Sequence, residues 1–410
     1  MEPAGSKQLE WAVRGLFIVF FAPFIVYSLT GAAMGDRPYR AVQVLHTVAL
    51  AFVAILVSRQ SNVRLSGVAK GLSVFLVLSW AITLITSLMQ NRPETNAVIL
   101  TQTTFLFVAI LLSFDLLARR YSFEDFAEVA APLAFVMLAV AAVHLQFSAV
   151  RIWGRALYFN LHPNLGGEML FGAIALVAMH KNPAFRWAGY ALGMFGLLQL
   201  QSRAAEIATL FVIAGCEMPR TRRGFEIVAV GGLAVSALVC IGLLLNNNLA
   251  SGLFAFIDDT ILMKHDPFRG EGTGLVGRAD TWIMALEKMT ARPFSGTGLN
   301  QSGLTVMGNG IHNGFIKNLA DFGVPGILID VLILWGIVAA IRVEWRRGIV
   351  VAACAILFFF NARTISMNIF PLLLWLAILP WRAPGLESAW QRRPSQRDLA
   401  FAPRGVRGVT

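Results

Sequence analysis

The chain has 410 residues, of which 57% are hydrophobic and 14% are charged, and its mean hydropathy is +0.66. A soluble domain has about 45–50% apolar and about 25% charged residues, so this composition excludes an ordinary soluble domain and predicts an all-α polytopic membrane protein. The net charge of +11 is explained by basic loops that face anionic lipid on the cytoplasmic side. It therefore does not call for a nucleic-acid partner, and the membrane lipids are the expected surroundings.

Hydrophobic stretches in the chain predict about twelve transmembrane helices, several of them short, because a span needs about 20 apolar residues. The first stretch is longer than the apolar region of a signal peptide, so we expect it to be retained as the first helix. The predicted spans lie near residues 11–33, 41–57, 67–89, 97–117, 129–150, 165–179, 187–201, 204–217, 225–245, 323–341, 348–362 and 365–380.

Basic residues in the short connecting segments predict the orientation. With the N-terminus in the cytoplasm, fifteen Lys and Arg residues fall inside and seven outside, as the positive-inside rule requires. Both termini are then cytoplasmic, and the one long loop is periplasmic. The predicted divisions are an N-terminal transmembrane bundle of about nine helices (1–245), a periplasmic loop domain (246–322), C-terminal transmembrane helices (323–380) and a disordered basic tail (381–410).

Two amphipathic helices are predicted inside the long loop, lying on the membrane surface or over a cavity. The segment "RADTWIMALEKMTARP" has apolar residues at helical spacing and stops at Pro293. The segment "HNGFIKNLADFG" has the same spacing and ends at Gly323. The apolar positions are Trp282, Ala285, Leu286 and Met289 in the first helix and Phe315, Leu319 and Phe322 in the second.

On the predicted periplasmic side, all seven basic residues outside the long loop are arginines. A guanidinium group is always charged, and its planar fork suits phosphate oxygens, so these arginines could hold a phosphate or pyrophosphate. The alternative is that they reach lipid headgroups at the ends of the helices. Arg203 differs because it lies between two apolar segments with almost no loop, so it needs a partner, for which Glu206 is a candidate. The seven are Arg37, Arg40, Arg92, Arg151, Arg155, Arg203 and Arg363.

The sequence predicts neither a metal site nor a cofactor. The six histidines form no HxxxH or HExxH pattern, and no cysteine lies near them. The glycine-rich "GEGTGLVGR" at 270–278 lacks the Lys-Ser/Thr pair of a phosphate-binding loop, so a nucleotide-dependent reaction is not expected.

Four segments together resemble the O-antigen ligase and polysaccharide polymerase superfamily of bacterial inner membranes. The two most specific are the last two, which occur together in the long loop with the expected spacing. Ala204 departs from the glycine that the superfamily often has after its Ser-Arg pair. The segments are "FNLHPNLGGEML" (159–170), "LQSRAAE" (200–206), "GRADTWIMALEKMTARPFSGTG" (277–298) and "IHNGFIKNLADFGVPG" (311–326).

The resemblance implies a metal-independent glycosyltransferase of the C-type membrane fold. Such an enzyme takes a glycan from undecaprenyl pyrophosphate at the periplasmic face of the inner membrane. Its acceptor is lipid A-core in a ligase, or a second lipid-linked glycan in a polymerase that makes O-antigen or exopolysaccharide. Carried over to this chain, the superfamily's essential residues are Arg203, Arg278 and His312.

The residue types fit that reaction. A pyrophosphate leaving group needs positive charge, which Arg203 and Arg278 would supply. The acceptor hydroxyl needs a base, and His312 is predicted to begin a helix whose positive end keeps the imidazole neutral. Displacement at the anomeric carbon would then invert its configuration. Further substrate-binding residues are predicted at Arg151, Arg155, Asn164, Asn313 and Arg363.

Alternatives remain open at this point. His312 could instead cap its helix or bind the backbone. A transporter would also have about twelve spans, but it would concentrate its charged groups at mid-bilayer. A scaffolding membrane protein would not need the histidine and arginine set. The sequence does not separate ligase from polymerase.

Overall fold

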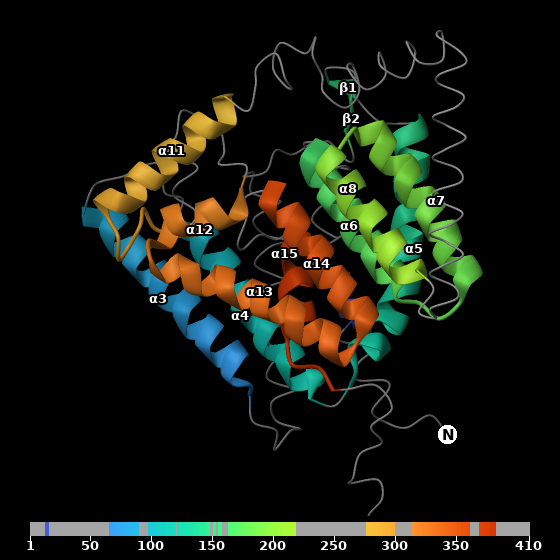
Figure 1. Ribbon diagram of the computed structural model, residues 1–410, viewed down its shortest axis with the longest axis horizontal. Helices are drawn as coiled ribbons and strands as arrows, with labels where there is room; N and C mark the ends of the chain where they lie inside the picture. The colour runs from blue at the N-terminus through green and yellow to red at the C-terminus, as the bar shows by residue number, and fades with distance from the viewer. Residues whose placement is uncertain are drawn as a thin grey trace, which may run out of the picture.

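The computed structural model describes residues 13–15, 65–89, 97–119, 121–147, 151–152, 155–157, 163–218, 276–299, 313–360 and 369–382. This part of the chain is helical apart from a short antiparallel hairpin, β1 with β2, and one bridge between Ser122 and Arg382 (Figure 1). Its elements are α3 (Gly67–Met89), α4 (Ala97–Ala118), α5 (Phe123–Phe147), β1 (Arg151–Ile152), β2 (Arg155–Ala156), α6 (Pro163–Ala178), α7 (Pro183–Leu200), α8 (Arg203–Glu217), α11 (Val276–Ala291), α12 (Gly314–Phe322), α13 (Pro325–Val343), α14 (Trp345–Phe360) and α15 (Ile369–Ile378).

Four of the described helices are long and apolar enough to cross a membrane: α3, α4, α5 and α13. The apolar α6 is shorter, with 16 residues. The all-helical membrane architecture is thus confirmed, and the total of about twelve spans stays a prediction. Nearly all of the predicted spans 11–33, 41–57 and 225–245 lies outside the described residues.

Two pairs of neighbouring helices, α6 with α7 and α8 with α14, run in opposite directions, as close contacts between them show. Gly189 near the start of α7 packs on Val177 at the end of α6, and Gly196 near the end of α7 packs on Leu170. Gly215 at the end of α8 packs on Ile349 at the start of α14. The small glycine surface lets these helices approach closely.

These antiparallel contacts define two ends of the described helices, and each end is named here by one of its residues. The Glu344 end contains the end of α8, the junction of α13 and α14, and the end of α15. The Arg203 end contains the hairpin, the starts of α6 and α8, and the last turn of α14. Figure 1 shows the hairpin above α6 and α8, and the α13–α14 junction lies well below the hairpin.

The Glu344 end is fixed by buried polar groups. Arg347, which the sequence assigned to a basic cytoplasmic loop, is 3% exposed. Its Nε donates to the carbonyl of Ala377 at 2.7 Å, and its Nη2 donates to that of Leu379 at 2.5 Å. These carbonyls belong to the last turn of α15 and just beyond it, where no helical partner remains. Arg347 therefore ties the start of α14 to the end of α15.

The first two residues of the predicted disordered tail are part of this packing. Trp381 is buried between Phe123 and Phe126, with ring centroids 5.5 and 5.4 Å away. The N–H of Arg382 donates to the carbonyl of Ala118 at 2.9 Å. Trp381 and Arg382 therefore belong to the packed helices, and the rest of the predicted tail, 383–410, lies outside the described residues.

Replacing Arg347 with alanine should destabilise the protein strongly. The Ala377 carbonyl would lose the Arg347 donor, and a buried carbonyl left without a donor costs about 1–3 kcal/mol, while the Leu379 carbonyl would keep only the N–H of Trp381. The control is Arg342→Ala, because Arg342 is an exposed arginine near the same end. Thermal unfolding in detergent should show a clearly lower Tm for Arg347→Ala than for Arg342→Ala. Equal Tm values for the two variants would contradict the tie between α14 and α15.

Candidate active site

The two most specific sequence motifs fold as one unit at the end of α12. The turn that follows α11 docks on the carbonyls that α12 leaves without a helical partner. Thr297 N–H donates to the carbonyl of Ala320 at 2.8 Å, and Gly298 N–H donates to that of Asp321 at 2.9 Å. In the other direction, Val324 N–H donates to the carbonyl of Pro293 at 2.6 Å. The "PFSGTG" and "ADFGVPG" segments are therefore two halves of one structure.

Two glycines allow this docking. Gly323 has φ +69°, and a Cβ added to it would lie 2.2 Å from the carbonyl oxygen of Pro293. Gly296 has φ +58°, and its Cβ would lie 2.4 Å from the carbonyl group of Asp321. Both the backbone angle and the contact exclude any larger residue. This is the physical reason for glycine at these two motif positions.

Buried polar side chains hold α12 in place. Lys317 and Asp321 form an ion pair one turn apart and are 5% and 0% exposed. Asn318 Nδ2 donates to Asp330 Oδ1 of α13 at 2.7 Å. None of these three α12 side chains is among the predicted site residues, although the i,i+4 spacing of Lys317 and Asp321 is typical of an ion pair on a helix. Removing one partner would leave a buried charge uncompensated.

The start of α12 corrects one expectation about His312. Asn313 is the N-cap of the helix, 2% exposed, and its Oδ1 accepts a hydrogen bond from Ile316 N–H at 3.1 Å. The helix thus begins at Gly314 and not at His312. The oxygen of Asn313 has a structural role, whereas its predicted role in binding substrate stays a prediction. His312 itself lies outside the described residues.

The last turn of α14 is the point that α11 and α12 share. Phe358 contacts the start of α12: its ring lies where a Cβ on Gly314 would be, and its centroid is 5.2 Å from that of Phe315. The next residue, Phe359, is 6.3 Å from Trp282 of α11, ring centroid to ring centroid. Arg278 lies one turn before Trp282 along α11, so its backbone is near this end of α14.

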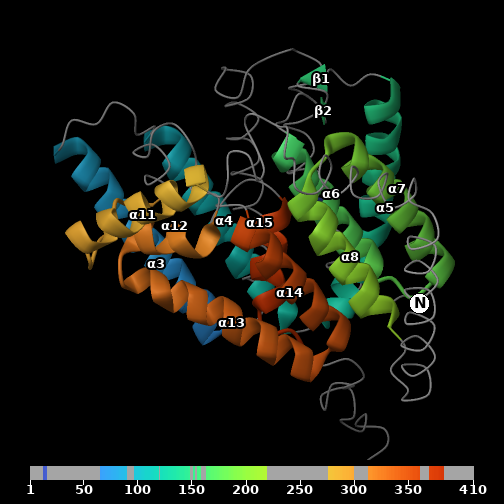
Figure 2. The same ribbon diagram turned by 45° about the horizontal axis from the view of Figure 1, so that its top comes forward.

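The start of α8 reaches the same level on the other side of α14. The two helices are antiparallel, with Gly215 beside Ile349. Arg203 lies twelve residues before Gly215, and Phe360 lies eleven residues after Ile349. At 1.5 Å per residue both distances are about 17–18 Å. Arg203 is therefore level with the last turn of α14, and Figure 2 shows α8 and α14 side by side.

The start of α6 and the hairpin complete the Arg203 end. Asn164 is in the first turn of α6, and Gly167 in the next turn packs directly on Ser202, the residue before Arg203. The hairpin contains Arg151 and Arg155 and packs on α7 through β2. Figure 1 places it beside the starts of α6 and α8.

The structure brings six of the eight predicted positions to the Arg203 end: Arg203, Arg278, Asn164, Asn313, Arg151 and Arg155. His312 and Arg363 lie outside the described residues. The predicted loop helices exist as α11 and α12. One member of their predicted apolar faces is an exception, since Leu286 is exposed while Ala285 packs on Ala320.

The comparisons with known proteins bear on this end of the molecule. Residues 188–331 match the family model described as O-Antigen ligase. The match runs from α7 into α13 and includes Arg203, Arg278 and the docked α12, so the resemblance seen in the motifs is confirmed over this segment. The motif at 159–170 lies outside it. A comparison with curated proteins gives no match.

Replacing Gly323 with alanine should disrupt the docked turn. The backbone angles of Gly323 are a region that costs other residues about 1–3 kcal/mol, and the contact with Pro293 adds to that cost. The control is Gly71→Ala, because a Cβ on Gly71 meets nothing within 4 Å. Thermal unfolding should give a lower Tm for Gly323→Ala and a Tm at or above that of the parent for Gly71→Ala. A Gly323→Ala variant as stable as Gly71→Ala would refute the docking.

Proposed function

We propose that this protein is an O-antigen ligase-like membrane glycosyltransferase, which moves a glycan from undecaprenyl pyrophosphate to an acceptor hydroxyl at the periplasmic face of the inner membrane. The family match supports a transferase that uses lipid-linked glycans. One observation carries the assignment of the site: the start of α8 and the α11–α12 unit lie at the same end of α14. Arg203 and Arg278, 75 positions apart in the chain, thereby serve one reaction.

The charge distribution supports the Arg203 end as the periplasmic one. Outside segment 246–322, the described basic residues at this end are Arg151, Arg155 and Arg203. The positive-inside rule assigns the end richer in Lys and Arg to the cytoplasm. The Glu344 end has Lys70, Arg119, Lys181, Arg186, Arg342, Arg346, Arg347 and Arg382.

Arg203 and Arg278 bind and stabilise the pyrophosphate. Their guanidinium groups neutralise the charge that develops as the lipid pyrophosphate departs. The position of Arg203 strengthens the attraction for the pyrophosphate. Arg203 is the first residue of α8, and the start of a helix attracts anions. The Ser202 side chain makes no capping hydrogen bond there. Asn164, Arg151 and Arg155 form the surrounding rim, with Arg363 as a further proposed member.

His312 acts as the general base. It removes the proton from the acceptor hydroxyl while that oxygen attacks the anomeric carbon. The bond from the anomeric carbon to the pyrophosphate oxygen breaks, and the electron pair leaves with the pyrophosphate. The anomeric configuration is inverted in this single displacement, and no metal ion takes part. The acceptor is lipid A-core for a ligase or a second lipid-linked glycan for a polymerase, and the same residues serve both.

Replacing His312 with alanine should lower the transfer rate by about 10²–10⁴-fold, the usual contribution of a general base. The amount of protein in the membrane and its Tm should stay near those of the parent. The control is His180→Ala, since His180 lies at the Glu344 end beside Glu128 and should be dispensable for transfer. The assay follows purified protein with a lipid-linked glycan and, separately, each class of acceptor.

A His312→Ala variant that transfers glycan at the parent rate would exclude the base role. Loss of the protein from the membrane would favour a structural role for His312 in helix capping. Product formed only with lipid A-core would identify a ligase, and product formed only from two lipid-linked glycans would identify a polymerase.

A further inference from the structure

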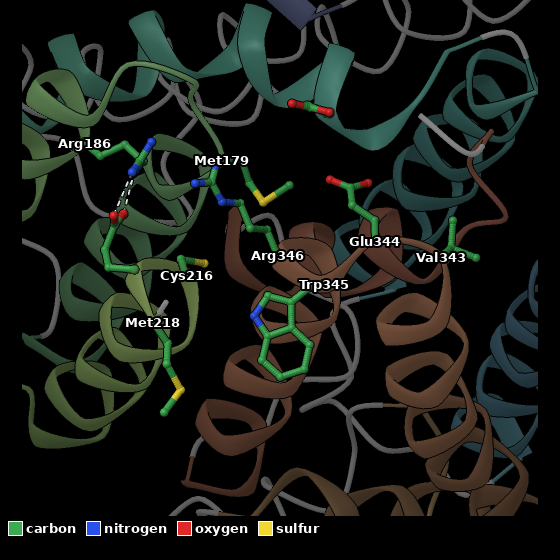
Figure 3. A pocket seen from close by; sticks show the side chains of 10 residues that line it. Met179, Arg186, Cys216, Met218, Val343, Glu344, Trp345 and Arg346 are labelled. Atoms are coloured by element: carbon green, nitrogen blue, oxygen red, sulfur yellow. Dashed lines mark hydrogen bonds and ion pairs between the residues drawn. The ribbon is translucent and has the colours of Figure 1, made fainter. Parts of the chain in front are cut away.

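A polar cavity of ≈ 580 Å³ opens at the Glu344 end, on the opposite side of the molecule from the candidate active site. Its walls come from the start of α5, the end of α6, the start of α7, the end of α8 and the α13–α14 junction (Figure 3). The charged residues that line it are Glu124, Arg186, Glu217, Glu344 and Arg346. Pockets that bind small molecules usually have volumes of about 300–1,000 Å³, so the volume of this cavity suits a ligand the size of a lipid headgroup.

One wall of the cavity is already satisfied by its own contacts. Arg186 Nε and Nη2 donate to the two carboxylate oxygens of Glu217 at 2.5 and 2.7 Å. Arg186 Nη1 donates to the carbonyls of His180 and Lys181 at 3.0 and 3.1 Å, and Tyr190 OH donates to Glu217 at 2.9 Å. This pair is therefore a rigid structural element and is not the group that calls for a ligand.

The facing wall has charged groups without such partners. Arg346 forms no hydrogen bond or ion pair with any residue in the described part of the chain, although its charge acts on Glu217 and Glu344. It extends from the start of α14 toward Arg186 and Met179, with Glu344 beside it (Figure 3). Glu344 Oε2 is buried and has no hydrogen-bond partner among the described residues. Glu124 lines the same cavity from α5.

These groups favour a ligand with charges of both signs. A simple anion would be attracted by Arg346 and repelled by the carboxylates of Glu344 and Glu124. A simple cation would be attracted by the carboxylates and repelled by Arg346. A phosphate would match the guanidinium fork of Arg346. A primary ammonium would donate N–H bonds to Glu344 and Glu124, which a quaternary ammonium cannot do.

The rim of the cavity is apolar and exposed, as expected at the level of lipid headgroups. Met218, Val343 and Trp345 line the cavity and are 39%, 46% and 38% exposed. Trp345 Nε1 donates to the carbonyl of Gly215 at 2.9 Å, so the indole is held between α8 and α14. Tryptophan at the end of a membrane helix is typical of the headgroup region.

We propose that this cavity binds the headgroup of a phospholipid that contains a phosphate and a primary ammonium, with the phosphate on Arg346 and the ammonium on Glu344 and Glu124. Phosphatidylethanolamine has this chemistry. The free headgroup, glycerophosphoethanolamine, has the same phosphate and ammonium groups. It is the alternative ligand, and the test below distinguishes it from the intact lipid. Lipid binding here does not require the transferase activity proposed above.

The electrostatics around Glu344 agree with an ammonium partner. Burial is the main cause that raises the pKa of Glu344 to about 7; the Glu124 and Asp125 carboxylates also act to raise it, and Arg347 and Arg346 act to lower it. A bound ammonium stabilises the ionised form of Glu344. Binding should therefore strengthen as the pH rises from 6 to 8, and this pH dependence should be lost in Glu344→Gln.

The test is thermal unfolding of the full-length protein in detergent, titrated with short-chain phosphatidylethanolamine. The lipid should raise the Tm in a saturable way, because it binds the folded state. Phosphatidylcholine and phosphatidylglycerol of the same chain length should give much smaller rises. Arg346→Gln and Glu344→Gln should each weaken the apparent affinity at least about tenfold, a loss of about 1.4 kcal/mol. The exposed Arg342→Gln should respond like the parent.

Native mass spectrometry of the parent protein gives a readout that does not depend on the variants. One phosphatidylethanolamine should remain bound and should not exchange for an excess of phosphatidylcholine. Equal responses to the three lipids, an unchanged response in Arg346→Gln, or no saturable response would overturn the proposal. If glycerophosphoethanolamine binds with the same apparent affinity as the lipid, the headgroup site is supported and the intact lipid is excluded as its specific ligand.

Discussion

Packing along α14 determines the arrangement of both ends of the molecule. The start of α14 contacts the end of α8 through Ile349 and Gly215 and the end of α15 through Arg347. Its last turn contacts α12 through Phe358 and α11 through Phe359. Because one rigid helix makes all of these contacts, the height of Arg203 on α8 and the position of the α11–α12 unit are fixed relative to each other. The candidate active site depends on this single helix more than on any other element.

Local features of the sequence were enough to predict the elements of the loop. Helical spacing of apolar residues, followed by Pro293 and Gly323, predicted α11 and α12 with nearly correct ends. Other boundaries depended on polar residues that a search for apolar stretches passes over. Helix α5 begins at Phe123, six residues before the predicted span, because Ser122 and Asp125 cap each other: Ser122 N–H donates to Asp125 Oδ2 at 2.9 Å, and Asp125 N–H donates to Ser122 Oγ at 3.1 Å.

The sequence was enough to predict which residues belong to the candidate site, but not the contacts between helices that bring them together. The motifs selected Arg203, Arg278 and the 311–326 segment, and the family match covers all three. No spacing along the chain could show that Thr297 and Gly298 bind the end of α12, or that Phe358 and Phe359 of α14 contact α12 and α11. These contacts link residues far apart in sequence and arise only when the helices pack. The same is true of buried Arg347, which a charge count assigns to a loop.

The two ends of the bundle have different kinds of charged groups. At the Arg203 end, arginine positions gather around helix starts, which suits a pyrophosphate. At the Glu344 end, Arg346 and Glu344 face a cavity of mixed charge, which suits a zwitterionic headgroup. On this account the helical bundle separates the proposed active site from the proposed lipid site, one at each end.

Photo-crosslinking to the donor tests most directly whether α8 and α12 form one site. A photo-reactive phenylalanine derivative would replace Ala204 in the first turn of α8, Phe315 in the first turn of α12, or exposed Val343 at the Glu344 end. After irradiation with a radiolabelled lipid-linked glycan, the account predicts labelled protein from positions 204 and 315 and none from position 343. Labelling from only one of positions 204 and 315, or equally strong labelling from position 343, would contradict a shared site at the Arg203 end.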